Sequence, residues 1–208
     1  MHKRELERRL SALEGFEEPS ADREQYRTPS PIAAHVVHLA GLHDDLTGTV
    51  VDLGAGTGVL AIGAALAGAD RVVGVEIDPS AIHVARANEE AVGPPVAIDW
   101  IRGDGERPPV CLDSATVLTN PPFGAQRGRR HADRGFLGAA ADVATVSYSI
   151  HNGGSRSFVE SFAADAGGTI THAYEATFTL PRQFDHHEED ERTLETEVFR
   201  IEWTGGHS

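Results

Sequence analysis

Short apolar runs recur along the chain and are separated by longer amphipathic stretches. Runs bounded by turn-forming residues predict buried strands at residues 49–53, 71–76, 96–101, 115–118 and 143–150. Apolar residues at helical spacing predict helices over residues 3–14, 59–66 and 79–91. Two further helices are predicted to begin at the prolines at 29 and 31 and at residue 155. Strands that alternate with helices in this way are typical of an α/β fold with a largely parallel sheet.

Apolar and polar residues alternate along residues 169–180 and 194–203, which therefore predict an antiparallel pair. With this hairpin the chain is expected to form a seven-stranded, mostly parallel sheet with an antiparallel C-terminal hairpin. No internal repeat and no long linker divides the sequence. We expect one domain over residues 1–208, made of an N-terminal helical segment (1–45) that covers a cofactor and a sheet core (46–204).

Composition narrows the class of protein. The 208 residues are enough for one domain with a full core. A single cysteine, Cys111, excludes an internal disulfide framework and a multi-cysteine zinc site. No apolar stretch approaches the roughly 20 residues of a membrane-spanning helix, and the N-terminus lacks the apolar run of a signal peptide. We therefore expect a cytoplasmic protein.

The net charge is strongly negative, at −14, because 32 acidic residues outnumber 18 Lys and Arg. Acidity of this kind normally argues against nucleic-acid binding, which phosphate attraction dominates. The chain has only one lysine, Lys3, and is rich in alanine and glycine. This composition favours adaptation to a high-salt (halophilic) cytoplasm, since the Debye length at 1 M salt is about 3 Å. Local basic patches, and not net charge, then indicate possible partners.

A glycine-rich segment follows the first predicted strand directly. Its sequence is Gly54-Ala55-Gly56-Thr57-Gly58, and the helix that follows starts at Val59. A strand, a glycine loop and a helix in this order let the backbone approach a ligand closely. The spacing fits neither a Walker loop nor the G-x-G-x-x-G fingerprint. Asp52, just before the glycines, disfavours a pyrophosphate and favours a ligand with a positive amino group, such as that of methionine.

Acidic residues also follow the next two predicted strands. Glu76 ends the second strand about 20 residues after the glycine loop, where a carboxylate accepts hydrogen bonds from ribose hydroxyls. Asp104, followed by Gly105, can accept from an adenine amino group. Because the carboxyl ends of parallel strands share one sheet edge, these residues together predict an S-adenosylmethionine site.

Two polar residues before the second predicted helix, Gln25 and Thr28, can meet a ligand beside the free N–H groups of the helix start. The alternative is that Thr28 or Ser30 only caps this helix.

The fourth predicted strand ends in the motif Asn120-Pro121-Pro122-Phe123 (NPPF), followed by Gly124. The two prolines cannot continue the strand, because neither has an N–H for the ladder. The motif suits methylation of an exocyclic amino group. The Asn120 side-chain oxygen and the Pro121 carbonyl can bind both N–H groups and free the nitrogen lone pair, and Phe123 can stack on the ring. The alternative is that Asn120-Pro121-Pro122 only forms a turn.

Basic residues follow this motif, at Arg127, Arg129, Arg130, His131 and Arg134. We interpret them as a flexible loop that holds nucleic-acid phosphates beside a flipped base; the alternative is a solvated, mobile loop. His186 and His187 lie in an acidic segment between the last two predicted strands. Neighbouring residues on a strand face opposite sides, so an exposed hairpin tip is favoured there over a metal site, and we expect no metal.

With these motifs, the chain resembles the methyltransferase-like protein 5 family, most closely its archaeal branch. These proteins are adenine-N6 methyltransferases of small-subunit ribosomal RNA. The likeness covers nearly the whole chain. It rests on Leu6-Glu7, Gly15-Phe16-Glu17, residues 24–28, Asp52-Leu53-Gly54 with Gly56 and Gly58-Val59-Leu60, residues 120–124, and Tyr148-Ser149-Ile150-His151.

The resemblance implies a Rossmann-like class I S-adenosylmethionine-dependent methyltransferase that modifies N6 of an adenine in RNA. It implies the acceptor site at residues 120–123 and a small zinc-binding activator subunit as partner, which could add to a sheet edge. The implied cofactor contacts are Gln25, Thr28, Gly54, Thr57, Val59, Glu76, Asp104 and Gly105.

Three other functions stay open from the sequence. A glutamine-N5 methyltransferase acting on protein shares the Asn-Pro-Pro motif, but it prefers tyrosine at the position of Phe123 and usually carries a separate recognition domain. A DNA adenine methyltransferase is the second, although no segment of this chain is recognisable as a reader of base sequence. The third is an RNA scaffold that binds the cofactor without turnover. The intact NPPF motif argues against it, because a scaffold does not need this motif.

Overall fold

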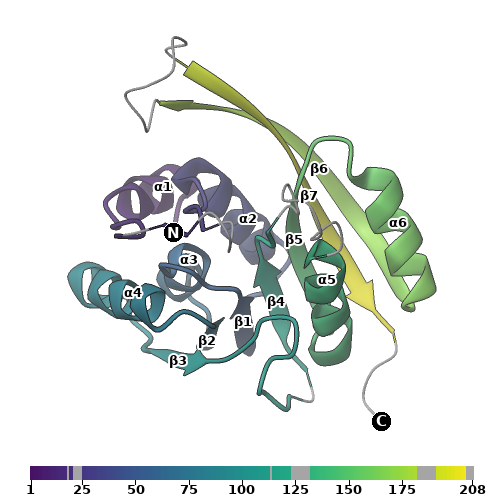
Figure 1. Cartoon of the computed structure of the whole chain (residues 1–208), viewed down its shortest axis with the longest axis horizontal. Helices are drawn as coiled ribbons and strands as arrows, with labels where there is room; N and C mark the ends of the chain where they lie inside the picture. The colour runs from purple at the N-terminus through teal and green to yellow at the C-terminus, as the bar shows by residue number, and fades with distance from the viewer. Residues whose placement is uncertain (18, 21–24, 113, 123–131, 182–190, 205–208) are drawn as a thin grey trace.

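A single mixed sheet organises the protein, which is seen here in a computed structural model (Figure 1). The structure describes residues 1–17, 19–20, 25–112, 114–122, 132–181 and 191–204. The seven strands lie in the order β3-β2-β1-β4-β5-β7-β6. They are β1 (Thr49–Leu53), β2 (Arg71–Glu76), β3 (Ile98–Arg102), β4 (Thr116–Thr119), β5 (Val146–Asn152), β6 (Gly168–Pro181) and β7 (Glu191–Trp203).

The first five strands are parallel, and β7 runs antiparallel to both β5 and β6. The predicted sheet and its C-terminal hairpin are therefore confirmed. The order reverses at β1, which pairs with β2 on one side and with β4 on the other. This is the switch point of an open α/β sheet, where the carboxyl ends of the strands leave room for a ligand.

Helices cover both faces of the sheet (Figure 1). On one face, α1, α2 and α3 pack on Leu118, Tyr148 and Ile150, and on the other face α5 and α6 pack on Val117 and Phe199. The helices are α1 (Lys3–Ser11), α2 (Ser30–Leu42), α3 (Val59–Ala67), α4 (Pro79–Val92), α5 (Ala132–Val143) and α6 (Arg156–Asp165). In the described part of the chain, no helix has the length and apolar composition that crossing a bilayer would need.

Helix α5 was not predicted. Residues 127–134 were interpreted as a flexible basic loop, but Arg134 lies inside this helix, so that interpretation is wrong at this position. Glycines at 135 and 138 lower the helix propensity of the segment. The helix forms because Phe136, Leu137 and Ala140 are buried against the sheet, and tertiary packing outweighs intrinsic propensity.

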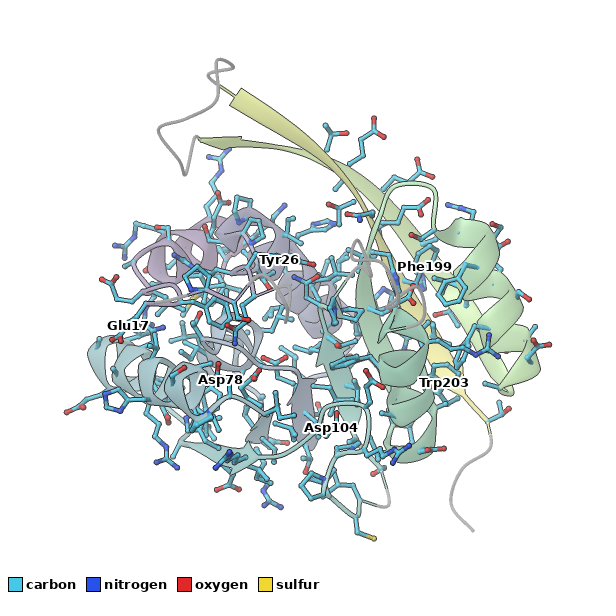
Figure 2. All side chains as sticks on the ribbon, viewed as in Figure 1. Glu17, Tyr26, Asp78, Asp104, Phe199 and Trp203 are labelled. Atoms are coloured by element: carbon cyan, nitrogen blue, oxygen red, sulfur yellow. The ribbon has the colours of Figure 1, made fainter. Side chains whose placement is uncertain are left out.

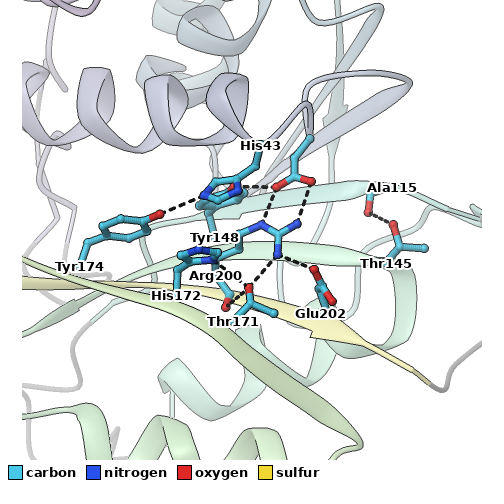
Figure 3. A network of polar contacts seen from close by, with 10 residues as sticks. His43, Ala115, Thr145, Tyr148, Thr171, His172, Tyr174, Arg200 and Glu202 are labelled. Atoms are coloured by element: carbon cyan, nitrogen blue, oxygen red, sulfur yellow. Dashed lines mark hydrogen bonds and ion pairs between the residues drawn. The ribbon is translucent and has the colours of Figure 1, made fainter.

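A buried ion pair ties the C-terminal hairpin to the turn after α2 (Figure 3). Arg200 on β7 donates through Nε and Nη2 to the two carboxylate oxygens of Asp45, at 2.7 and 3.0 Å. Tyr148 on β5 donates its hydroxyl to the same carboxylate at 2.6 Å, and this contact adds to burial in raising the pKa of Tyr148. Arg200 Nη1 also donates to Thr171 and Glu202. The pair of Arg200 and Asp45 therefore joins four segments: the turn after α2, β5, β6 and β7.

Replacing Arg200 by methionine is expected to lower the free energy of unfolding by about 3 kcal/mol, because Asp45, whose side chain is only 11% exposed, would lose its cation. Chemical denaturation measures this loss. Arg71→Met is the matched control, since Arg71 pairs with Asp99 but both side chains are more than half exposed. That variant should change stability by less than about 1 kcal/mol. Equal effects of the two variants would show that the buried network does not stabilise the hairpin.

Candidate functional site

The glycine loop joins β1 to α3 and needs unusual backbone angles. Gly54, Gly56 and Gly58 have φ values of 72°, 54° and 89°, in the left-handed region that other residues rarely adopt. At Gly58 an added Cβ would also lie 2.7 Å from the Trp100 ring. These glycines bring the backbone close to the space above the sheet edge and start α3 directly after it.

Asp52 lies beneath this loop and is 1% exposed. Its Oδ2 accepts a hydrogen bond from the Ala61 N–H at 2.9 Å, in the first turn of α3. Its Oδ1 is buried and has no hydrogen-bond partner among the described residues. Burial raises the pKa of Asp52 to about 7, against the lowering effect of the Ala61 N–H, and the nearby charge of Glu76 raises it further. A buried acidic group with an unused oxygen is suited to a cationic ligand.

Glu76 braces the glycine loop from the end of β2. Its two oxygens accept from the Gly56 N–H at 2.8 Å and the Asp78 N–H at 2.9 Å. A carboxylate has about four acceptor positions, so these two bonds leave acceptor capacity for the predicted bonds to ribose hydroxyls. The brace itself was not predicted from the sequence.

The cap of α4 by Asp78 was predicted from the sequence and is confirmed, whereas the exposure of Ile77 and the contact between Asp78 and Gln25 were missed. Ile77 is 54% exposed although it is a large apolar residue. Asp78 caps α4 by accepting from the Ser80 N–H, and its other oxygen accepts from Gln25 Nε2 at 2.7 Å. Predicted site residue Gln25 is thus held at the end of β2. The only sequence signal for the missed features was an apolar residue, Ile77, between two acidic residues at the end of a predicted strand.

Asp104 and Gly105 follow β3 at the same edge of the sheet. The Asp104 side chain is exposed, and its Oδ1 accepts from the Glu106 N–H. Gly105 is buried, and an added Cβ there would clash with the Phe136 ring and lie 3.0 Å from the Gly54 nitrogen. Glycine therefore lets this loop contact the first glycine loop. Figure 2 shows Asp78 and Asp104 in the half of the molecule that holds β1 to β4, away from Phe199 and Trp203 on β7.

Asn120 follows β4 beside the glycine loop. Leu53 and Thr119 are register partners, and the Thr119 hydroxyl donates to the Leu53 carbonyl at 2.9 Å, so Asn120 and Gly54 leave the sheet side by side. Asn120 Nδ2 donates to the Thr28 hydroxyl at 2.9 Å. Its Oδ1 is buried and finds no hydrogen-bond partner in the described residues. Pro121 is buried next to it, whereas Phe123 and Gly124 lie outside the described residues.

The predicted site residue Thr57 contributes another buried polar atom without a described partner, after those of Asp52 and Asn120. Its Oγ1 is buried without a described partner, like Asp52 Oδ1 and Asn120 Oδ1. Leaving a polar atom buried and unpaired costs about 1–3 kcal/mol. Three such atoms on the elements that meet at the switch point indicate a site that receives a polar ligand. Val59, the first residue of α3, is buried directly after the loop.

Most of these residues fall within the span of a known family model. Residues 34–147, more than half of the 208, match the model of the methyltransferase small domain. The chain belongs to the methyltransferase small domain family.

Relatives match this family member along nearly its whole length. The uncharacterized protein MJ0284 of Methanocaldococcus jannaschii is 37% identical over 98% of this chain and 95% of its own. The rRNA N(6)-adenosine-methyltransferase Mettl5 of Drosophila melanogaster is 33% identical over 96% of this chain and 95% of its own. Both matches include the glycine loop and the Asn-Pro-Pro segment within their span.

Solved structures agree with the sheet order. The crystal structure of PH1948 from Pyrococcus horikoshii, described as a candidate RNA methyltransferase, superposes with a TM-score of 0.84 and 38% identity, covering 97% of this chain and 98% of its own. Magnesium protoporphyrin IX methyltransferase from Synechocystis, solved with bound S-adenosylmethionine, has a TM-score of 0.62 at 16% identity, covering 83% of this chain and 78% of its own. The fold is that of class I S-adenosylmethionine-dependent methyltransferases, as predicted.

Most of the predicted RNA-binding residues lie outside the residues that the structure describes. Arg127, Arg129, Arg130 and the neighbouring His131 are among the residues not described, and so are His186 and His187 of the predicted hairpin tip. Arg134 is exposed on α5, with its guanidinium carbon 5.1 Å from the centre of the Phe162 ring. In the ranges that the structure describes, no group of three or more His, Cys, Asp or Glu side chains is placed to hold a metal ion.

Proposed function

We propose that this protein transfers a methyl group from S-adenosylmethionine to N6 of an adenine in RNA, specifically in small-subunit ribosomal RNA. The observation that carries the proposal is Asn120 Oδ1, a buried acceptor without a described partner, at the carboxyl end of β4 and beside the glycine loop. An acceptor in this position suits a substrate that presents an N–H group. It does not suit a substrate that presents only oxygen acceptors.

The residues around the glycine loop suit the cofactor. We assign the methionine amino group to Asp52, the backbone approach to Gly54, Gly56 and Thr57, and the ribose hydroxyls to Glu76. Asp104 with Gly105 would meet the adenine ring, and Gln25, Thr28 and Val59 would border the site. Bound S-adenosylmethionine supplies a methyl group activated by a positively charged sulfur. Residues 1–45 are proposed to cover it, because Gln25 already contacts Asp78 at the sheet edge.

Asn120 and Pro121 would prepare the acceptor. When both acceptors, the Asn120 oxygen and the Pro121 carbonyl, hold the two N–H groups of an exocyclic amine, the nitrogen lone pair is drawn out of conjugation with the ring. Pro122 stiffens this turn, and Phe123 is proposed to stack on the base, which is worth about 1–3 kcal/mol. The surplus proton of the methylated amine passes to water.

RNA as the substrate is supported by the relatives, since the Drosophila protein is an rRNA N(6)-adenosine-methyltransferase of nearly equal length. The basic run Arg127, Arg129, Arg130 and Arg134 is proposed to hold phosphates beside the flipped adenine. A small zinc-binding activator subunit is proposed as partner on the resemblance to the methyltransferase-like protein 5 family.

The proposal is tested by methyl transfer from labelled S-adenosylmethionine at high salt. Small-subunit ribosomal RNA, free ribosomal protein and duplex DNA are offered separately, with and without the activator subunit. We expect label in the RNA alone. Label in protein would favour a glutamine-N5 methyltransferase, label in DNA a DNA adenine methyltransferase, and cofactor binding without any transfer a scaffold.

Glu76→Gln is expected to weaken S-adenosylmethionine binding by at least about tenfold. The glutamine amide would place an N–H against the N–H of Gly56 or Asp78, which costs about 1–3 kcal/mol, and would move the glycine loop. Isothermal titration calorimetry measures the change in Kd. Glu90→Gln, an exposed position on α4, is the matched control and should bind like the wild type. An unchanged Kd for Glu76→Gln would refute its assigned role.

A further inference from the structure

Residues 25–28, here called the strap, connect two parts of the site that belong to different strands. Gln25 contacts Asp78 after β2 at 2.7 Å, and three residues later Thr28 contacts Asn120 after β4 at 2.9 Å. Arg27 between them donates to the Leu10 carbonyl near the end of α1. The strap is therefore fixed to α1 as well as to both strand ends, and its side chains have defined positions.

Thr28 does not serve as a helix cap. Helix α2 begins at Ser30, and its N-cap residue is Pro29, which makes no side-chain cap hydrogen bond. The capping alternative for Thr28 and Ser30 is thus wrong. The hydroxyl of Thr28 instead contacts a side chain 92 residues away in the sequence. The contact therefore holds the only amide of the NPPF motif, the one proposed to bind the substrate amine.

In the structure this contact leaves the oxygen end of the amide for a ligand. An asparagine amide has an NH₂ end and an oxygen end, and a half-turn about its last torsion exchanges them. Because Nδ2 donates to Thr28, the oxygen is the end that stays unpaired and buried. With the amide reversed, NH₂ would face the substrate amine, donor against donor, and Asn120 would no longer hold the amine in position for transfer.

We propose that Thr28 is a positioning residue, whose hydroxyl oxygen holds Asn120 Nδ2 so that Asn120 Oδ1 accepts the N–H of the substrate amino group. The inference rests on the proposed function. It differs from the expectation that Thr28 contacts the cofactor, because it predicts an effect on the methyl-transfer step and none on cofactor affinity.

Thr28→Val keeps the shape of the side chain and removes the hydroxyl. We expect kcat for RNA methylation to fall about 10- to 100-fold, the range for loss of one positioning hydrogen bond. The Kd for S-adenosylmethionine and the KM for RNA should stay within about threefold. Thr28→Ser restores the hydroxyl and should recover kcat to within about threefold. Ser30→Ala, which removes a hydroxyl two residues away, is the matched control and should behave as wild type.

Nuclear magnetic resonance can detect the contact between Thr28 and Asn120 in the absence of turnover. In ¹⁵N–¹H spectra the Asn120 side-chain amide is identified by the signal that Asn120→Asp removes. Its protons should shift and exchange faster with water in Thr28→Val, and return towards wild-type values in Thr28→Ser. If Thr28→Val does not fold, Thr28→Ala is compared with Thr28→Ser in the same way.

Either of two kinetic results would overturn this inference and leave the proposed function intact: a kcat for Thr28→Val near that of an active wild type, or a raised Kd for S-adenosylmethionine with unchanged kcat. An unshifted Asn120 amide signal in Thr28→Val would do the same. Wild-type protein that leaves adenine unmethylated in every RNA would instead refute the proposed function, and the inference with it.

Discussion

Asn120→Ala is expected to lower kcat for methyl transfer about 1,000-fold while S-adenosylmethionine binds within a few-fold of wild type. Loss of one acceptor aimed at the reacting group typically has an effect of this size. The truncation removes both the oxygen that binds the amine and the NH₂ group that contacts Thr28. Single-turnover kinetics with saturating cofactor measure the rate of the chemical step directly.

Asn152→Ala is the matched control for this variant. Asn152 is an exposed asparagine at the end of β5, on the strand next to β4. Its loss should leave kcat unchanged. Turnover of Asn120→Ala near that of wild type would contradict the role assigned to the amide, and a large rise in cofactor Kd would show that Asn120 contributes to cofactor binding instead.

Asp52→Asn is expected to stabilise the cofactor-free protein at pH 8 and to weaken S-adenosylmethionine binding at least about tenfold. Burial raises the pKa of Asp52 from 3.8 in the reference state to about 7 in the folded protein. The folded state therefore keeps a proton that the unfolded state loses between these values, and stability falls as pH rises from about 4 to 7. Above pH 7 the folded protein holds a buried charge, which the neutral amide of asparagine avoids.

The gain in stability should be about 1–3 kcal/mol at pH 8 and should vanish near pH 4, as thermal or chemical denaturation would measure. In the wild type, affinity for the cationic cofactor should rise with pH through about 7, because only the ionised carboxylate pairs with the methionine amino group. Asp52→Asn should lack this dependence. Asp142→Asn, at an exposed position on α5, is the control. Equal pH profiles of cofactor binding in wild type and Asp52→Asn would refute the assignment.

The order and type of most elements could be predicted from the sequence, since strands and helices follow from apolar periodicity and from turn-forming residues. The limits of β2 were predicted as observed, at residues 71–76. The hairpin was predicted with slightly shorter strands than the observed Gly168–Pro181 and Glu191–Trp203. Helix α5 was missed because glycines interrupt the segment and a basic run precedes it, and its burial against the sheet is a property of the folded chain.

The site could be predicted only where local sequence carries the signal. Asp52, Glu76 and Asn120 each stand at a strand end, and the sheet brings these ends to one edge. The contacts between distant residues were not predictable. Thr28 and Asn120 are 92 residues apart, and Gln25 and Asp78 are 53 apart, and no periodicity relates such positions. The bracing of Gly56 by Glu76 was also missed, because the motif suggested only a ligand contact.

The atom that receives the methyl group tests the account most directly. Small-subunit ribosomal RNA would be methylated at high salt with S-adenosylmethionine carrying a deuterated methyl group, then digested to nucleosides and separated by liquid chromatography with mass detection. We predict that the deuterated product co-elutes with N6-methyladenosine and is lost with Asn120→Ala. Deuterium in a ring-nitrogen or ribose-methylated nucleoside, at the same level in wild type and Asn120→Ala, would contradict the account.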